Sequence, residues 1–139
     1  MLTAAQLLLG AAACAAFVFA ARRLAPRHEL TIYAVGFVAA ALSYVAFAAA
    51  GDASGAWLAV EFAGLLVFSL AALTRLRRSP LLLASGWAAH ALWDSLLHSG
   101  ASADFVPDWY GIVCAGFDFA LADYLTLLSR HAVTSAVTS

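Results

Sequence analysis

The sequence predicts an all-α integral membrane protein, a bundle of five transmembrane helices. Of its 139 residues, 65% are hydrophobic and only 11% are charged, and the mean hydropathy is +0.92. Soluble domains contain about half apolar and about a quarter charged residues, so a chain this small could not hide so much apolar surface from water. The apolar residues also fall into five runs, each near the roughly 20 residues that cross a bilayer. We therefore expect a multi-pass protein whose solvent is the lipid bilayer.

Short polar breaks separate the five runs. Each break contains the charge, Gly or Pro that is typical of a connection; the breaks are Arg22–His28, Gly51–Gly55, Arg77–Pro80 and Ser99–Asp108. We expect a single domain (1–139) that ends in a polar tail at 133–139. Its helices are expected at about 2–21, 29–50, 56–76, 81–98 and 109–128.

The arginines predict how these helices cross the membrane. The chain has no lysine, and its seven arginines follow the first, third and fifth runs: Arg22, Arg23, Arg27, Arg75, Arg77, Arg78 and Arg130. With five spans all of them lie on one side, and basic residues mark the cytoplasmic side. We expect the N-terminus outside and the C-terminus inside the cell (inner) membrane. Because charge follows the first run instead of preceding it, that run is expected to be a retained helix and not a signal peptide. The lack of lysine and the abundance of alanine suggest a bacterial source.

Three ionisable residues stand four apart on the fourth run: His90, Asp94 and His98. Four residues is close to one helical turn, so these side chains share one face. Ionisable residues within a membrane span face the bundle interior and are functional candidates. At about 1.5 Å per residue, His90 and Asp118 lie near the midplane, and Glu61 and Asp94 lie about one turn further out.

Further polar residues fall on the same faces. Tyr44 and Cys114 lie at the level of Asp94, and Tyr110, Cys114 and Asp118 form one stripe on the fifth run. The fourth and fifth runs are expected to be antiparallel neighbours whose stripes face each other. The result is a polar pocket open to the outside, with Cys114, Tyr110 and Tyr44 as its second-rank members. Small residues let helix backbones approach closely in membranes, and four are candidates for such contacts: Gly64, Gly86, Gly111 and Gly116.

Imidazoles and carboxylates in one pocket suit a divalent metal such as zinc, iron or manganese, with an open coordination position for water. We expect metal ligands among His90, Asp94, His98 and Asp118, and catalytic roles for Asp94, Asp118 and Glu61. Zinc lowers the pKa of its bound water to about 7 and so supplies hydroxide for ester or amide cleavage. The leading hypothesis is a metal-dependent hydrolase, or a related enzyme, acting on a lipid-like substrate.

Two other hypotheses stay open. In the first, the polar groups only hydrogen-bond to one another, and the chain is a non-catalytic subunit or assembly factor of a larger membrane complex or a homo-oligomer. Such bonds contribute only about 0.6 kcal/mol each on average in membranes. In the second, acids and histidines relay protons or ions. However, Asp118 and Asp123 point about 140° apart on a helix, which argues against a continuous path.

The net charge and the cysteines argue against a nucleic-acid-binding protein and against one held together by a disulfide or a zinc knuckle. A net charge of −1 argues against nucleic acid as a partner. The two cysteines, Cys14 and Cys114, lie in separate apolar runs, so neither a disulfide nor a zinc-knuckle spacing is expected.

The segment 86–94 has the pattern G-W-x2-H-x2-W-D, and His98, Pro107, Gly111, Cys114 and Asp118 follow it. This pattern resembles a family of small uncharacterised bacterial multi-pass membrane proteins, in which such a helix precedes a final helix with a glycine, a cysteine and an aspartate. The likeness covers about the last third of the chain and departs from the family in the spacing of the cysteine from the aspartate. It implies a shared site at His90, Asp94 and Asp118 but no particular reaction. In its general arrangement only, with histidines and acids inside a membrane bundle, the layout also resembles the intramembrane zinc hydrolases of the alkaline ceramidase and adiponectin receptor type. Those have a different number of helices and other spacings, so none of their residues is carried over.

Overall fold

The computed structural model describes residues 2–74, 76–98 and 104–137. Within these ranges the chain contains helices and no strand, which confirms the predicted all-α fold. Two short 3-10 helices, η1 (Pro26–His28) and η2 (Leu76–Arg78), occupy the links before the second and fourth long helices. The long helices are α1 (Leu2–Leu24), α2 (Glu29–Ala50), α3 (Gly55–Thr74), α4 (Pro80–Leu97) and α5 (Asp108–Val137). Arg75, one of the arginines used for the topology, lies outside the described residues.

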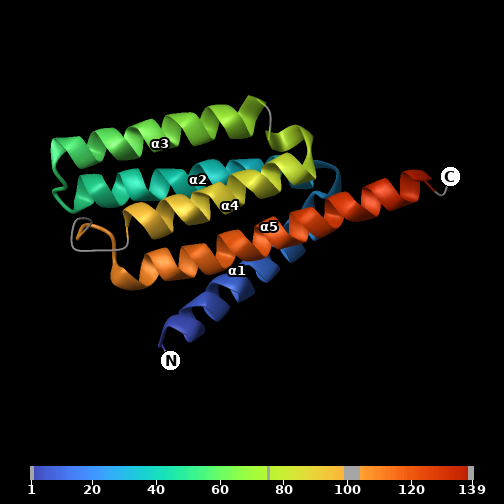
Figure 1. Cartoon of the computed structure of the whole chain (residues 1–139), viewed down its shortest axis with the longest axis horizontal. Coiled ribbons are helices and arrows are strands. Elements are labelled where there is room, and N and C mark those ends of the chain that lie inside the picture. Colours follow the sequence, from blue (N-terminus) through green and yellow to red (C-terminus); the bar gives the residue numbers. More distant parts are fainter. Residues whose placement is uncertain (1, 75, 99–103, 138–139) are drawn as a thin grey trace.

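The five long helices lie side by side, and successive helices run in opposite directions (Figure 1). α5 packs along both α1 and α4, whereas α2 packs along α3 and also touches α4. The expected antiparallel pairing of α4 with α5 is therefore confirmed. The N-terminus, the α2–α3 turn and the α4–α5 connection lie at one end of the bundle, and η1, η2 and the C-terminus lie at the other (Figure 1).

Local sequence explains where the helices begin and end. Pro80 stands in the first turn of α4, and the Ser79 side chain caps that helix by accepting a hydrogen bond from the Leu82 N–H at 3.4 Å. Gly51 follows the last residue of α2, and Asp52 turns the chain with a φ of 51°. α2 begins and ends at the predicted residues, and α1, α3 and α4 differ from prediction only near their ends.

α5 departs most from the expected bounds. It continues through Val137, so the helix includes most of the segment 133–139 that was expected to be a polar tail. Between Leu128 and Val137 there is no Gly or Pro to end the helix. A polar sequence outside a bilayer can stay helical in continuity with an apolar segment, because the costly first turn has already formed. The final two residues, 138–139, lie outside the described residues.

The outer surface of the bundle is apolar. Leu8, Leu66 and Leu96, on three different helices, are 70%, 61% and 76% exposed. Four segments are long and apolar enough to cross a membrane: Thr3–Leu24, Pro26–Ala50, Gly55–Thr74 and Asp108–His131. α4 is not among them, because polar residues, including His90 and Asp94, lower the mean hydropathy of its 18 residues. The described residues thus form a membrane protein by length and composition, with four spans assigned on this basis.

α1 and α5 approach each other closely at two glycines. A Cβ at Gly116 would clash with the carbonyl oxygen of Leu7, and a Cβ at Gly10 would clash with that of Val113. Gly116 therefore acts as predicted, whereas the role of Gly10 was missed. The expectation for Gly111 was wrong, because its missing side chain faces open space. The two other expected glycines, Gly64 and Gly86, are both buried, and Gly64 faces the Trp93 ring.

Candidate functional site

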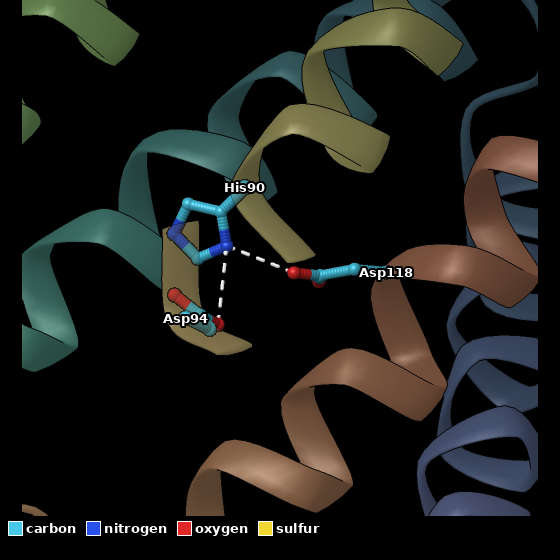
Figure 2. A group of neighbouring side chains, drawn as sticks. All are labelled: His90, Asp94 and Asp118. Atoms are coloured by element: carbon cyan, nitrogen blue, oxygen red, sulfur yellow. Dashed lines mark hydrogen bonds and ion pairs between the residues drawn. The ribbon is translucent and has the colours of Figure 1, made fainter. Parts of the chain in front are cut away.

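The centre of the bundle holds a buried group of one histidine and two aspartates. His90 and Asp94 come from successive turns of α4, and Asp118 comes from α5 (Figure 2). The His90 Nδ1 lies 2.8 Å from the Asp118 Oδ2 and 3.5 Å from the Asp94 Oδ2. Because a carboxylate only accepts, the His90 Nδ1–H is the donor to Asp118. Both acids thus approach one ring nitrogen of His90, and all three residues are 2% exposed or less.

Aromatic rings pack around His90. Phe68 of α3 and Phe37 of α2 meet the imidazole edge to face, with ring centroids 5.3 and 5.6 Å away. Trp87 and Tyr44 lie further out, at 6.4 and 6.1 Å. This apolar wall keeps water from the histidine and lowers the local dielectric, so its contacts with the carboxylates are strengthened. Phe37 and Phe68 were not predicted from the sequence to be part of the site, although each lies two helical turns from a polar residue that was, Tyr44 and Glu61 respectively.

The group has the composition of a metal site. Each of the three residues offers one ligand atom, and these atoms all lie within 4.8 Å of one another. One imidazole and two carboxylates are donors that zinc, iron and manganese accept, and three protein ligands leave a coordination position open. Three of the four expected metal ligands are therefore brought together.

The fourth expected ligand, His98, belongs to a separate pair. Its Nε2 lies 2.8 Å from the Oε1 of Glu61 on α3, and both side chains are buried. The Tyr44 ring stacks on the His98 imidazole with centroids 4.2 Å apart and planes inclined by 23°. His98 and Glu61 are thus not members of the His90 group. They lie nearer the end of the bundle, because His98 is two helical turns beyond His90 along α4.

One cavity connects the buried group with this second pair. It has a volume of about 550 Å³ and opens at the end of the bundle that carries the α4–α5 connection. Asp94 and His98 both line it, together with residues from the first turns of α1 and α5. Neither oxygen of Asp94 forms a hydrogen bond of regular geometry with any described residue, and the same is true of the His98 Nδ1. Asp94 and His98 therefore border the cavity, while their polar side-chain atoms are themselves buried and have bonding capacity to spare.

The three second-rank residues surround the same region. Tyr44 lies within electrostatic range of Asp94, and its ring packs against that of Tyr110 at 5.7 Å. The Tyr110 hydroxyl donates a hydrogen bond to the Ser43 Oγ at 2.7 Å. Cys114 is half-buried and lines a smaller cavity, of about 230 Å³, with Tyr110 and with Asp118 among its other walls. These residues bound the polar region but do not join the His90 group.

Asp123 lies apart from all of these residues. It is exposed on α5 and borders a groove against α4 with Ser85 and Thr126. It therefore does not extend a path inward from Asp118, in agreement with the opposite facing expected from the helix period.

Comparisons of the chain with family models, with curated proteins and with solved structures gave no match. Fold and site together define a class of protein, a small all-helical membrane protein with a buried histidine–aspartate group beside a cavity. The function has to be inferred from that geometry.

Proposed function

We propose that this chain is a metal-dependent membrane enzyme of the hydrolase type, acting on a lipid-like substrate that enters the 550 Å³ cavity. The observation that carries the proposal is the position of Asp94. Asp94 borders the cavity, and its buried carboxylate contacts the His90 ring nitrogen at 3.5 Å and lies near the Tyr44 hydroxyl, without a hydrogen bond of regular geometry to the described residues. A buried carboxylate that is incompletely compensated for the loss of water is costly, and a bound cation at this point would offset that cost.

Charge favours a divalent ion over a proton alone. Two carboxylates and one neutral imidazole leave the group with excess negative charge in a medium that does not tolerate it. His90, Asp94 and Asp118 would hold the metal, which would be bound in competition with protons. When bound, the metal supplies a water of lowered pKa at the cavity wall.

The pair of Glu61 and His98 supplies a proton acceptor for that water. Glu61 accepts the hydrogen bond from the His98 Nε2–H, which fixes the ring and leaves Nδ1 as the free acceptor. Because His98 and Asp94 border the same cavity, a substrate there would adjoin both the acceptor residue and one of the metal ligands. In this assignment His98 is the general base and Glu61 is the positioning residue that orients it.

The proposal includes five spans with the N-terminus outside. The exposed side of α4 is apolar, with Leu82, Leu92 and Leu96 47%, 54% and 76% exposed, and its acid and histidine face inward. α4 thus presents hydrocarbon to lipid despite its lower mean hydropathy. The described arginines lie at the end of the bundle opposite the cavity, so the positive-inside rule favours a cavity open to the outer leaflet of the cell membrane.

Metal analysis of the purified protein tests this proposal. After purification in detergent without chelators, the wild-type chain is expected to carry about one equivalent of zinc, iron or manganese. His90→Ala and Asp118→Asn should each reduce it below about a tenth of an equivalent, because each removes one of three protein ligands. Inductively coupled plasma mass spectrometry gives the number directly.

Matched controls are available for both variants. His28 is exposed on η1 and Asp123 is exposed on α5, so His28→Ala and Asp123→Asn should retain the metal. In vesicles containing ester- and amide-linked lipids, the metal-loaded protein should release fatty acid, and His98→Gln should slow this release without removing metal. Wild-type protein without metal, or His90→Ala with undiminished metal, would overturn the proposal in favour of a purely structural polar cluster.

A further inference from the structure

A second cavity lies at the arginine-bearing end of the bundle, between α1 and α5. Its volume is about 640 Å³ and, among the described residues, its lining includes two arginines and no acid. It begins just beyond the close approach of α1 and α5 at Gly10 and Gly116. Alanines such as Ala15 and Ala120 form much of its wall, so the surface is a hollow and not a ridge. None of the three residues of the His90 group lines this groove, and it plays no part in the proposed chemistry.

The groove combines an apolar length with a charged mouth. From Ala11 to Arg23 it follows α1 for about 18 Å at about 1.5 Å per residue. That length is close to one leaflet, or about half of the roughly 30 Å hydrocarbon core of a bilayer. Arg22 and Arg23 lie at its end and are exposed. The Arg23 guanidinium lies 5.1 Å from the centroid of the Phe19 ring, which holds it beside the groove.

A hydroxyl also lies beside the groove. Tyr124 borders the groove, and its buried hydroxyl neighbours that of Tyr33, without a hydrogen bond of regular geometry within the described part of the chain. A hydroxyl with spare bonding capacity can donate to an acceptor that enters beside it. Phosphodiester and glycerol ester oxygens are acceptors that an amphiphile in this groove would bring.

We infer that the groove between α1 and α5 binds an anionic glycerophospholipid, with an acyl chain along the alanine wall and the phosphate at Arg22 and Arg23. Basic pockets between transmembrane helices recognise anionic headgroups in this way. Charge complementarity selects the headgroup, and the apolar length selects a lipid over a free phosphate. The inference does not depend on the proposed metal site.

Native mass spectrometry of the full-length protein in detergent tests this inference. Wild type should retain one molecule of dioleoylphosphatidylglycerol under conditions in which dioleoylphosphatidylcholine is lost. The double variant Arg22→Gln/Arg23→Gln should weaken retention about tenfold or more. The matched control Arg77→Gln/Arg78→Gln removes the same charge from exposed residues of η2 and should change it less than about twofold. Because binding is measured after purification, any effect of these arginines on membrane insertion does not enter.

A third variant separates the groove from the charge. Ala15→Phe fills the groove while keeping both arginines, and it should also reduce retention of phosphatidylglycerol. Equal retention of the two lipids, equal losses in the two arginine variants, or full retention by Ala15→Phe would each overturn the inference. Metal content is expected to stay at the wild-type level in all of these variants, so failure here is distinguishable from failure of the proposed enzyme.

Discussion

Five acidic or histidine side chains are buried among the described residues, and four of them have a hydrogen-bond partner on another helix. His90 is bonded to Asp118, and Glu61 is bonded to His98. Removing one member of such a pair leaves the other buried with an unmet hydrogen bond, which costs more than the net contribution of the bond itself. Substitutions of single residues should therefore reveal which contacts stabilise the fold and which serve the site.

The pair of Glu61 and His98 permits a stability prediction. Glu61→Ala leaves the His98 Nε2–H without an acceptor and should lower the free energy of unfolding by about 1–3 kcal/mol. Glu61→Gln keeps an oxygen acceptor in the same place and should lower it less. Unfolding in dodecylmaltoside micelles with increasing sodium dodecyl sulfate measures the difference.

The only other glutamate provides the control for this prediction. Glu29 lies in the first turn of α2 with no histidine bonded to it among the described contacts, so Glu29→Ala should cost less than about 1 kcal/mol. In the double variant Glu61→Ala/His98→Ala the two losses should be less than additive, because both remove the same bond. Additive losses would mean that the two residues act independently in the folded bundle.

Helix packing depends on where small residues meet. α1 is joined to the remainder of the bundle mainly through α5, and Gly10 and Gly116 set how closely the two helices approach. Association of helices in lipid gains little from hydrophobic burial, so close packing at such positions supplies much of the stability. The two positions are therefore expected to be sensitive to the addition of a single methyl group.

Two glycines on α5 make a matched test of this packing. Gly116→Ala places a Cβ against the Leu7 carbonyl, forces the helices apart, and should destabilise the protein by about 1–3 kcal/mol. Gly111→Ala meets nothing within 4 Å and should leave stability unchanged or raise it by up to about 1 kcal/mol, because Ala is the better helix former. Thermal unfolding of both variants in one detergent gives the comparison, and similar behaviour of the two would exclude steric control at the crossing.

At the scale of the whole molecule, the sequence was informative about depth along each helix. The four-residue spacing of His90 and Asp94 on α4, together with the depth of Asp118 on α5, was enough to predict that these three residues meet. Those predictions need only the helical rise and the antiparallel pairing of two neighbours, both of which the chain specifies locally.

The sequence did not indicate how non-adjacent helices are rotated relative to one another. Glu61 and Asp94 were expected at the same depth, but the bond between Glu61 and His98 was not predicted. That bond depends on the rotation of α3 about its axis, which is set by packing against α2. For the same reason the contact at Gly10 was not predicted and the contact expected at Gly111 was wrong, since a small residue does not specify which neighbour it faces. The C-terminal end of α5 was not predicted, because composition indicates where the apolar segment ends, and a helix can continue beyond that point.

The number of spans is a property of the whole chain, and α4 decides it. If α4 crosses the membrane, the termini lie on opposite sides, as at the two ends of the bundle in Figure 1. If it does not, the termini lie on the same side, and Arg130 is separated from Arg22, Arg23 and Arg27. Arginines are strongly favoured on the cytoplasmic side, and the exposed face of α4 is apolar, so five spans are expected.

Reporter fusions in bacterial cells test this topology. Green fluorescent protein fluoresces only inside the cell and alkaline phosphatase is active only outside it. A C-terminal fusion to the first should fluoresce, a C-terminal fusion to the second should be inactive, and alkaline phosphatase inserted at Ala53 in the α2–α3 turn should be active. Activity of alkaline phosphatase at both the turn and the C-terminus would mean that α4 does not cross. The His90 group would then lie on a helix lodged in the bundle and not in a span, and the outward opening of the cavity would lose its basis.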